Sequence, residues 1–295
     1  MNSTNTTVCE VIQPNGDVSG KGIRASIYAL CLGGRLLTLF TRAFSTREAS
    51  DEFERSYKSS LSIQGMAMLC TAWYESTHDK LTLFHAIVVL HLLSLLGINL
   101  ATRISPKGGS WLPFLMNGIL IVCAVAGFIA FNVYVWARAP NFGSQPECNS
   151  SVVYVLFGTS IQATNDIFRY TILATLALAP AVFIVVLICG LPCIALACCC
   201  SRDDADCTCP WLGDTPDPKS REPNWISETV QVLAYTAFSI YAIVSLEQMI
   251  SRNPVSEEES EWSFGQIIAL FLLLGPMIDF SNAVAAGIGR NRETR

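Results

Sequence analysis

Charged residues are scarce in this sequence, and their scarcity excludes most soluble folds. Only 15% of the 295 residues are charged, whereas 51% are hydrophobic and the mean hydropathy is +0.41. A soluble chain carries about 25% charged residues, because its surface must be hydrated. The sequence therefore predicts a membrane protein whose main partner is the lipid bilayer, with no nucleic-acid partner.

Histidine is rare and membrane lysine is absent, which excludes several families of multi-span proteins. The chain has three histidines, fewer than the four that haem cytochromes of the b561 type need. No lysine lies in an apolar segment, so retinal cannot be held as in microbial rhodopsins. The last apolar segment lacks the histidines of seven-span zinc hydrolases, and the D-R-Y and N-P-x-x-Y motifs of G-protein-coupled receptors are missing. We expect no cofactor and no bound metal.

Seven apolar segments are present, most of them near the ~20 residues that a helix needs to cross hydrocarbon. In lipid they must be helical, because every backbone amide needs an internal partner. The predicted fold class is all-α, an integral membrane bundle of seven transmembrane helices over residues 23–288, with tails at 1–22 and 289–295. The segments are approximately Ile23–Phe40, Leu61–Glu75, Leu81–Ala101, Trp111–Trp136, Tyr170–Ala197, Ile226–Ile250 and Trp262–Ile288.

The charges and the glycosylation sequons predict the orientation of this bundle. With the N-terminus outside and the C-terminus cytoplasmic, Lys and Arg favour the cytoplasmic side by about two to one, as the positive-inside rule requires. The sequons at Asn2, Asn5 and Asn149 all fall on the outer side. The sequence therefore predicts a multi-pass glycoprotein of the plasma membrane or the secretory pathway.

The cysteines divide between the two predicted compartments. Only Cys9 and Cys148 face the oxidising side, which predicts one disulfide between them, with two free thiols as the alternative. On the cytoplasmic side, the run Cys198, Cys199 and Cys200 lies beside the membrane, as palmitoylated cysteines do. Inert thiols are one alternative there, and a zinc site with the C-x-C pair at positions 207 and 209 is another.

Two charged residues lie inside the predicted spans, where each needs a partner or water. Arg35 in the first span and Asp279 in the last span have similar predicted depths. We expect them to form an ion pair that closes the bundle. The alternative is that Arg35 extends to the inner headgroups and Asp279 is neutral or hydrated.

A second polar set lies at the outer end of the second and third segments. It comprises Glu75, His78, Asp79 and His85, which could bind zinc or transfer a proton, or could simply line an interfacial hairpin. The acidic run 257–261 is predicted to be either a solvated loop or a collar that attracts cations to a pore.

Three stretches resemble a group of fungal multi-span membrane proteins of unassigned function. They are Ser19–Tyr28, Leu81–Ile87 and Trp262–Gln266. The resemblance covers about a quarter of the chain, implies a fungal source and brings no activity with it.

Residues Cys70–Glu75 resemble the A-W-E segment of membrane-bound terpene cyclases from fungal meroterpenoid pathways. That resemblance implies that Glu75 and Asp279 would be the catalytic acids. The predicted topology places the two residues toward opposite membrane faces, so the sequence leans against an enzyme.

The acidic run and the intramembrane charges favour a transport or channel-like function, with an unidentified ion or small molecule as ligand and a homo-oligomer as one possible assembly. A seven-span receptor or sensor is the first alternative. The terpene-cyclase-like enzyme and an accessory or organising membrane protein are the others.

Overall fold

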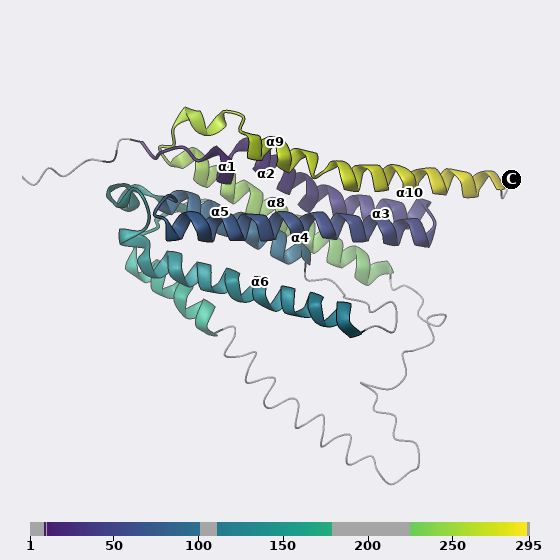
Figure 1. Cartoon of the computed structure of the whole chain (residues 1–295), viewed down its shortest axis with the longest axis horizontal. Coiled ribbons are helices and arrows are strands. Elements are labelled where there is room, and N and C mark those ends of the chain that lie inside the picture. Colours follow the sequence, from purple (N-terminus) through teal and green to yellow (C-terminus); the bar gives the residue numbers. More distant parts are fainter. Residues whose placement is uncertain (1–8, 10, 101–110, 179–224, 294–295) are drawn as a thin grey trace, which may run out of the picture.

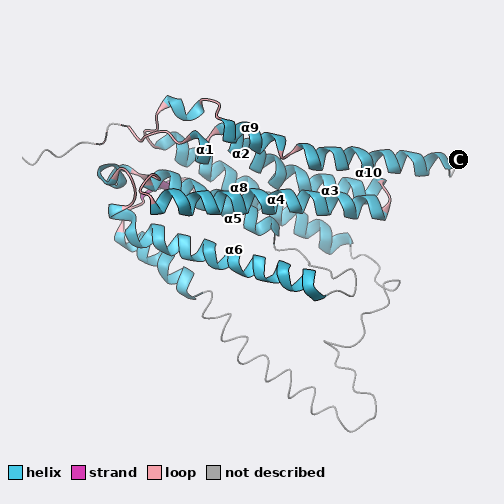
Figure 2. Ribbon diagram, viewed as in Figure 1, coloured by secondary structure: helices cyan, strands magenta, loops and turns pink. Residues whose placement is uncertain are grey.

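Long helices account for most of residues 9, 11–100, 111–178 and 225–293, which a computed structural model of the chain describes (Figure 1, Figure 2). Four helical stretches are long and apolar enough to cross a membrane: Gly16–Phe44, Gly118–Asn141, Thr229–Arg252 and Phe264–Gly289. A shorter apolar helix covers Leu83–Gly97.

The first stretch is not one regular helix. It consists of α1 (Gly16–Ser19), α2 (Lys21–Tyr28), a π-helical turn η1 (Ala29–Gly33) and α3 (Gly34–Phe44). Directly after the π-turn, the helix packs closely on its neighbour: a Cβ at Gly34 would overlap the ring of Tyr57. Glycine at this position therefore permits the close approach of α3 to the next helix.

Two helices form the centre of the bundle. The first, α4 (Arg47–Thr77), begins at Thr46, whose side chain accepts a hydrogen bond from the Ala49 amide and caps the first turn. The second, α5 (Leu83–Leu100), is apolar on every side, and its residues from Leu83 to Leu90 are all buried. It contacts α4, α6 and α8, so it is the core helix of the bundle.

The middle of the chain adds one long helix and a small cap. Helix α6 (Trp111–Arg138) leads through the short 3-10 turns η2 (Ala139–Asn141) and η3 (Pro146–Ser151) into an antiparallel hairpin. The hairpin strands are β1 (Val153–Leu156) and β2 (Thr159–Gln162), and a further helix covers residues 166–178.

The last part consists of α8 (Trp225–Arg252), the 3-10 turn η4 (Glu257–Ser260), α9 (Phe264–Phe271) and α10 (Leu274–Glu293). The helix is interrupted at residues 272–273, between α9 and α10, and α10 begins two residues before Pro276. Proline has no N–H to continue the backbone ladder, so it is tolerated in the first turn of a new helix.

Exposed apolar side chains cover the outside of this bundle. On α6 they include Ile119, Leu120 and Val122, and on α8 they include Val230 and Leu233. A continuous apolar surface on helices of this length is what lipid stabilises. The structure therefore agrees with a multi-pass membrane protein, with four helices that meet the length and composition of a span.

The two ends of the bundle differ. One end, which we call the disulfide end, holds α1, the hairpin and η4, and α10 terminates at the other end, which we call the opposite end (Figure 1). Of the predicted spans, Leu61–Glu75 lies in α4 and Leu81–Ala101 coincides largely with α5, while most of Tyr170–Ala197 falls outside the described residues.

Candidate functional site

The carboxylate of Glu259 in η4 is the centre of a buried polar cluster at the disulfide end. It accepts hydrogen bonds from the backbone amide of Asn15 at 2.7 Å, from the hydroxyl of Ser19, and from Nε2 of His85 at 3.2 Å. Only 7% of Glu259 is exposed, and His85 is completely buried. We call these four residues the Glu259 cluster; it joins the N-terminal segment, α5 and the loop after α8.

The partners of His85 define its hydrogen positions. An ionised carboxylate can only accept, so Nε2 of His85 carries the hydrogen that points to Glu259. Nδ1 of His85 lies 2.6 Å from the hydroxyl of Thr82, which also accepts from the His85 amide at 3.4 Å. Thr82 thus caps the start of α5 and holds the imidazole ring in place.

Hydrogen bonds control the ionisation of Glu259. Burial raises the pKa of this carboxyl. The hydrogen bond and charge of His85, together with the hydrogen bonds from Ser19 and Asn15, lower the pKa by more than burial raises it. The net pKa is therefore below the ordinary value. Glu259 is therefore a buried anion held by several donors, as buried charges require.

The predicted outer polar set is only partly assembled. Glu75 accepts a hydrogen bond from Nδ2 of Asn15 at 2.9 Å, so Asn15 links it to the Glu259 cluster. His78 is exposed and stacks on Tyr74, with 4.4 Å between ring centroids. Asp79 is exposed in the turn before α5, with a positive φ of 52°.

The four predicted residues therefore do not form one site. Of the Glu259 cluster, the sequence predicted only His85 as a site residue. The other members, Asn15, Ser19 and Glu259, are distant in the chain from the predicted hairpin. The acidic run itself was the available signal for Glu259, although it gave no direction for the side chain.

The order Thr82, His85 and Glu259 matches that of a hydroxyl nucleophile, a base and an acid, but its setting does not suit catalysis. Thr82 is 5% exposed, and its hydroxyl is already used in capping α5. Across the residues described, no group of three or more His, Cys, Asp or Glu side chains could hold a metal ion. The arrangement is suited to holding three segments together.

The charge contacts of the first apolar stretch also differ from the prediction. Arg24 of α2 forms an ion pair with Glu247 of α8, which Tyr28 also contacts through a hydrogen bond of 2.7 Å. Arg35 lies over the ring of Tyr235, 3.9 Å from its centroid. These contacts join the first stretch to α8, where the prediction paired it with the last helix.

Arg35 and Asp279 lie at different depths along the bundle. The hydroxyl of Ser45 donates to the carbonyl of Ala283, which places these two residues at the same level. Asp279 lies four residues before Ala283, and Arg35 lies ten residues before Ser45, each toward the disulfide end. Their levels along the bundle therefore differ by about 9 Å at 1.5 Å per residue. Arg24 and Glu247 form an ion pair between the first stretch and α8, and the pair of Arg35 and Asp279 stays a prediction.

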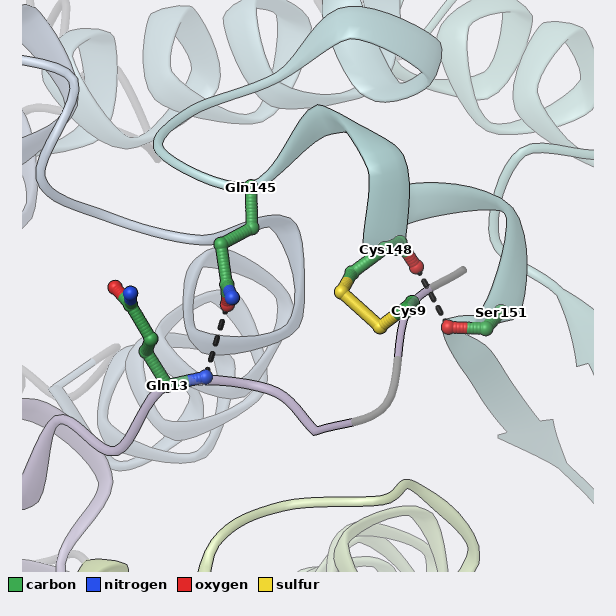
Figure 3. The surroundings of a disulfide bond; sticks show 5 residues. All are labelled: Cys9, Gln13, Gln145, Cys148 and Ser151. Carbon is green, nitrogen blue, oxygen red and sulfur yellow. Dashed lines mark hydrogen bonds between the residues drawn. A yellow bond between two sulfur atoms is a disulfide. The ribbon is translucent and has the colours of Figure 1, made fainter. Parts of the chain in front are cut away.

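A disulfide links the N-terminal segment to the loop after α6 (Figure 3). It joins Cys9 to Cys148, with 4.9 Å between the Cα atoms, as predicted. Beside it, the Gln13 amide donates to Oε1 of Gln145 at 2.8 Å. The N-terminal segment also pairs with the loop after α8, where the Ile12 amide donates to the Pro254 carbonyl at 2.8 Å.

The sequon at Asn149 is not suited to carry a glycan in this fold. Asn149 is 1% exposed, and its Nδ2 donates to the carbonyls of Phe142 at 2.9 Å and Pro140 at 3.4 Å. A sugar would replace one of the two hydrogens on that nitrogen, so at least one of these bonds would be lost, and the buried side chain leaves no room for it. Asn2, Asn5, Cys198, Cys199 and Cys200 lie outside the described residues.

Comparisons with family models, curated proteins and solved structures found no match to this chain. Its class is therefore defined by its own architecture, a helical protein with several apolar helices that agree with a multi-pass membrane protein.

Proposed function

We propose that this chain is a seven-span membrane protein of the receptor or sensor type, with its N-terminus outside and its C-terminus in the cytoplasm. The main support is the Glu259 cluster, which closes the disulfide end by hydrogen-bonding two segments, the N-terminal segment and α5, to one buried carboxylate of the loop after α8. In this proposal the disulfide end is the outer face, where an oxidising environment keeps the Cys9 to Cys148 bond intact.

The first apolar stretch provides a physical connection between the two ends. Ser19 in α1 contacts Glu259 at the disulfide end, and Ser45, directly after α3, contacts Ala283 at the opposite end. Between them lies the π-turn η1, and such turns often occur at functional sites of helices. A change in the Glu259 cluster would therefore reach the cytoplasmic end through one continuous segment.

The structure favours this function over a channel, which the sequence placed first. The collar proposed for a pore mouth loses its central acid, because Glu259 turns into the protein and is bonded there. Arg35, one of the two intramembrane charges that supported a channel, lies against Tyr235. Of the other acids of the run, Glu258 and Glu261 are exposed, as in the solvated-loop alternative.

The terpene-cyclase-like alternative is not favoured, because its two acids are too far apart. Glu75 is near the end of α4 at the disulfide end, and Asp279 lies one helical turn from Ala283 at the opposite end. At 1.5 Å per residue, they are separated by roughly 35 Å along the bundle. Two acids at that separation cannot act on one small substrate.

Hydrogen–deuterium exchange on the purified protein tests the proposal. The substitution Glu259→Gln should increase exchange at the disulfide end and also in α3 and residues 283–289 at the opposite end. Glu258→Gln, which changes an exposed neighbour, is the matched control and should change neither region.

Two results would overturn the receptor proposal. One is an exchange increase confined to the disulfide end, because the cluster would then have no connection to the cytoplasmic side. The other is sustained ion flux through the wild-type protein in sealed proteoliposomes, because that would restore the channel.

A further inference from the structure

A hollow of about 470 Å³ opens on the surface where α6 ends at the disulfide end. It is lined by Ala137, Arg138, Pro140, Asn141 and Arg169, so two of its five lining residues are arginines. The Glu259 cluster contributes nothing to it, and the proposed receptor function makes no use of it.

Arg169 is held in a fixed position in the wall of this hollow. Its side chain is 8% exposed and donates to the carbonyls of Trp136 at 3.0 Å and Ala137 at 2.9 Å, which caps the last turn of α6. It also contacts Asp166 at 3.0 Å, an otherwise exposed carboxylate. These bonds fix the guanidinium plane and neutralise the helix carbonyls that would repel an anion.

Arg138 provides the accessible charge. It is exposed and lies over the ring of Tyr134, 5.0 Å from the centroid. A guanidinium presents a planar fork of donors that matches the oxygens of a phosphate. Two arginines and Asp166 give the hollow a local charge of +1, which complements the single negative charge of a phosphodiester.

The position of the hollow selects the source of that phosphate. It lies at the end of the apolar stretch Gly118–Asn141, where Arg138 lies over the ring of Tyr134, and tyrosine is enriched at the membrane–water boundary. The exposed apolar side chains of α6, such as Ile119 and Val122, lie further along the same helix. The hollow is therefore at headgroup level, with lipid chains beside it.

We propose that the hollow at the end of α6 binds the phosphate of a phospholipid from the membrane leaflet on the disulfide side, with Arg138 and Arg169 as its ligands. The lipid chains would then run along the exposed face of α6. This site is independent of the proposed receptor function, so either proposal can fail without the other.

Native mass spectrometry of the purified protein in a sugar-headgroup detergent tests the site, with phosphatidylglycerol as the added probe. Arg138→Gln should weaken retention of one lipid by about ten-fold, as expected for the loss of a charge-assisted contact. Arg169→Lys keeps the charge but loses the fork, so it should also weaken retention. Lys80→Gln, at an exposed cation of the same end, is the control and should retain lipid as the wild type does.

Each outcome decides the proposal. Equal retention by Arg138→Gln and the wild type overturns it, and Arg138 is exposed, so this variant decides alone if Arg169→Lys fails to fold. Displacement of the lipid by inorganic phosphate at equal concentration would assign the site to free phosphate instead. Equal binding of a glycolipid that lacks phosphate would show that the arginines do not recognise the probe.

Discussion

At the scale of single residues, the buried carboxylate of Glu259 determines how the disulfide end is held. Its donors come from the N-terminal segment and from α5, so one side chain holds both segments to the loop after α8. Removing one member of a buried charged network leaves the others without partners, which costs more than the bond itself.

Glu259→Gln should lower the free energy of unfolding by about 1–3 kcal/mol, because the amide keeps the shape but loses the negative charge that three donors share. Equilibrium unfolding in mixed micelles would measure the change. Glu258→Gln should leave stability within about 0.5 kcal/mol, since its side chain is exposed. Equal effects of the two substitutions would contradict the special role of Glu259.

The lowered pKa of Glu259 predicts the direction of its pH dependence. A carboxyl whose pKa is lower in the folded state than in the unfolded state contributes stability above the unfolded value, and loses it as the pH falls through the folded value. The wild type should therefore lose this contribution progressively, from the ordinary titration range of a glutamate down through the lower folded pKa. In a pH series, the stability difference between wild type and Glu259→Gln should shrink with acid, and a constant difference would refute this explanation.

At the scale of elements, the close packing of α10 on α3 depends on small residues. A Cβ at Gly287 would overlap the carbonyl oxygen of Phe44, next to the contact between Ser45 and Ala283. The four-residue spacing of Ala283 and Gly287 already indicates such a contact in the sequence.

Gly287→Ala should destabilise the protein by about 1–3 kcal/mol, because the backbone must move to admit a methyl group. Gly275→Ala in the same helix is the matched control, because nothing lies within 4 Å of the new Cβ. It should be neutral or slightly stabilising, as expected for alanine in a helix. Thermal unfolding of both variants in detergent checks the difference, and equal midpoints would mean that α3 and α10 are not packed this closely.

At the scale of the whole molecule, the positions of the N-terminal segment and of α10 indicate the membrane topology. The N-terminal segment begins at the disulfide end and α10 terminates at the opposite end (Figure 1). An odd number of spans would produce this separation, and it is the basis of the proposed sidedness.

Epitope tags at the two termini should therefore be accessible from opposite sides of sealed cells. We expect an N-terminal tag to be labelled in intact cells and a C-terminal tag only after permeabilisation. A tag at an exposed cap position, such as next to Ser251, should be labelled like the N-terminal one. Labelling of both termini from the same side would require an even number of spans.

The sequence by itself determined the class of this molecule. Its apolar segments predicted long helices, and four helical stretches suited to spanning are present because segment length and composition are local properties. The Cys9 to Cys148 bond was also predictable, since no other cysteine falls on the predicted outer side.

Only the tertiary structure decided which polar groups meet. Glu259 turns inward to His85 and Asn149 holds a loop closed, although the sequence placed both on the outer surface. Arg24 pairs with Glu247 across two helices far apart in the chain. The physical reason is that side-chain direction depends on the rotation and depth of helices far apart in the chain. Hydropathy gives the length of a helix, but the packing of close contacts such as Gly34 on Tyr57 sets its rotation and its depth.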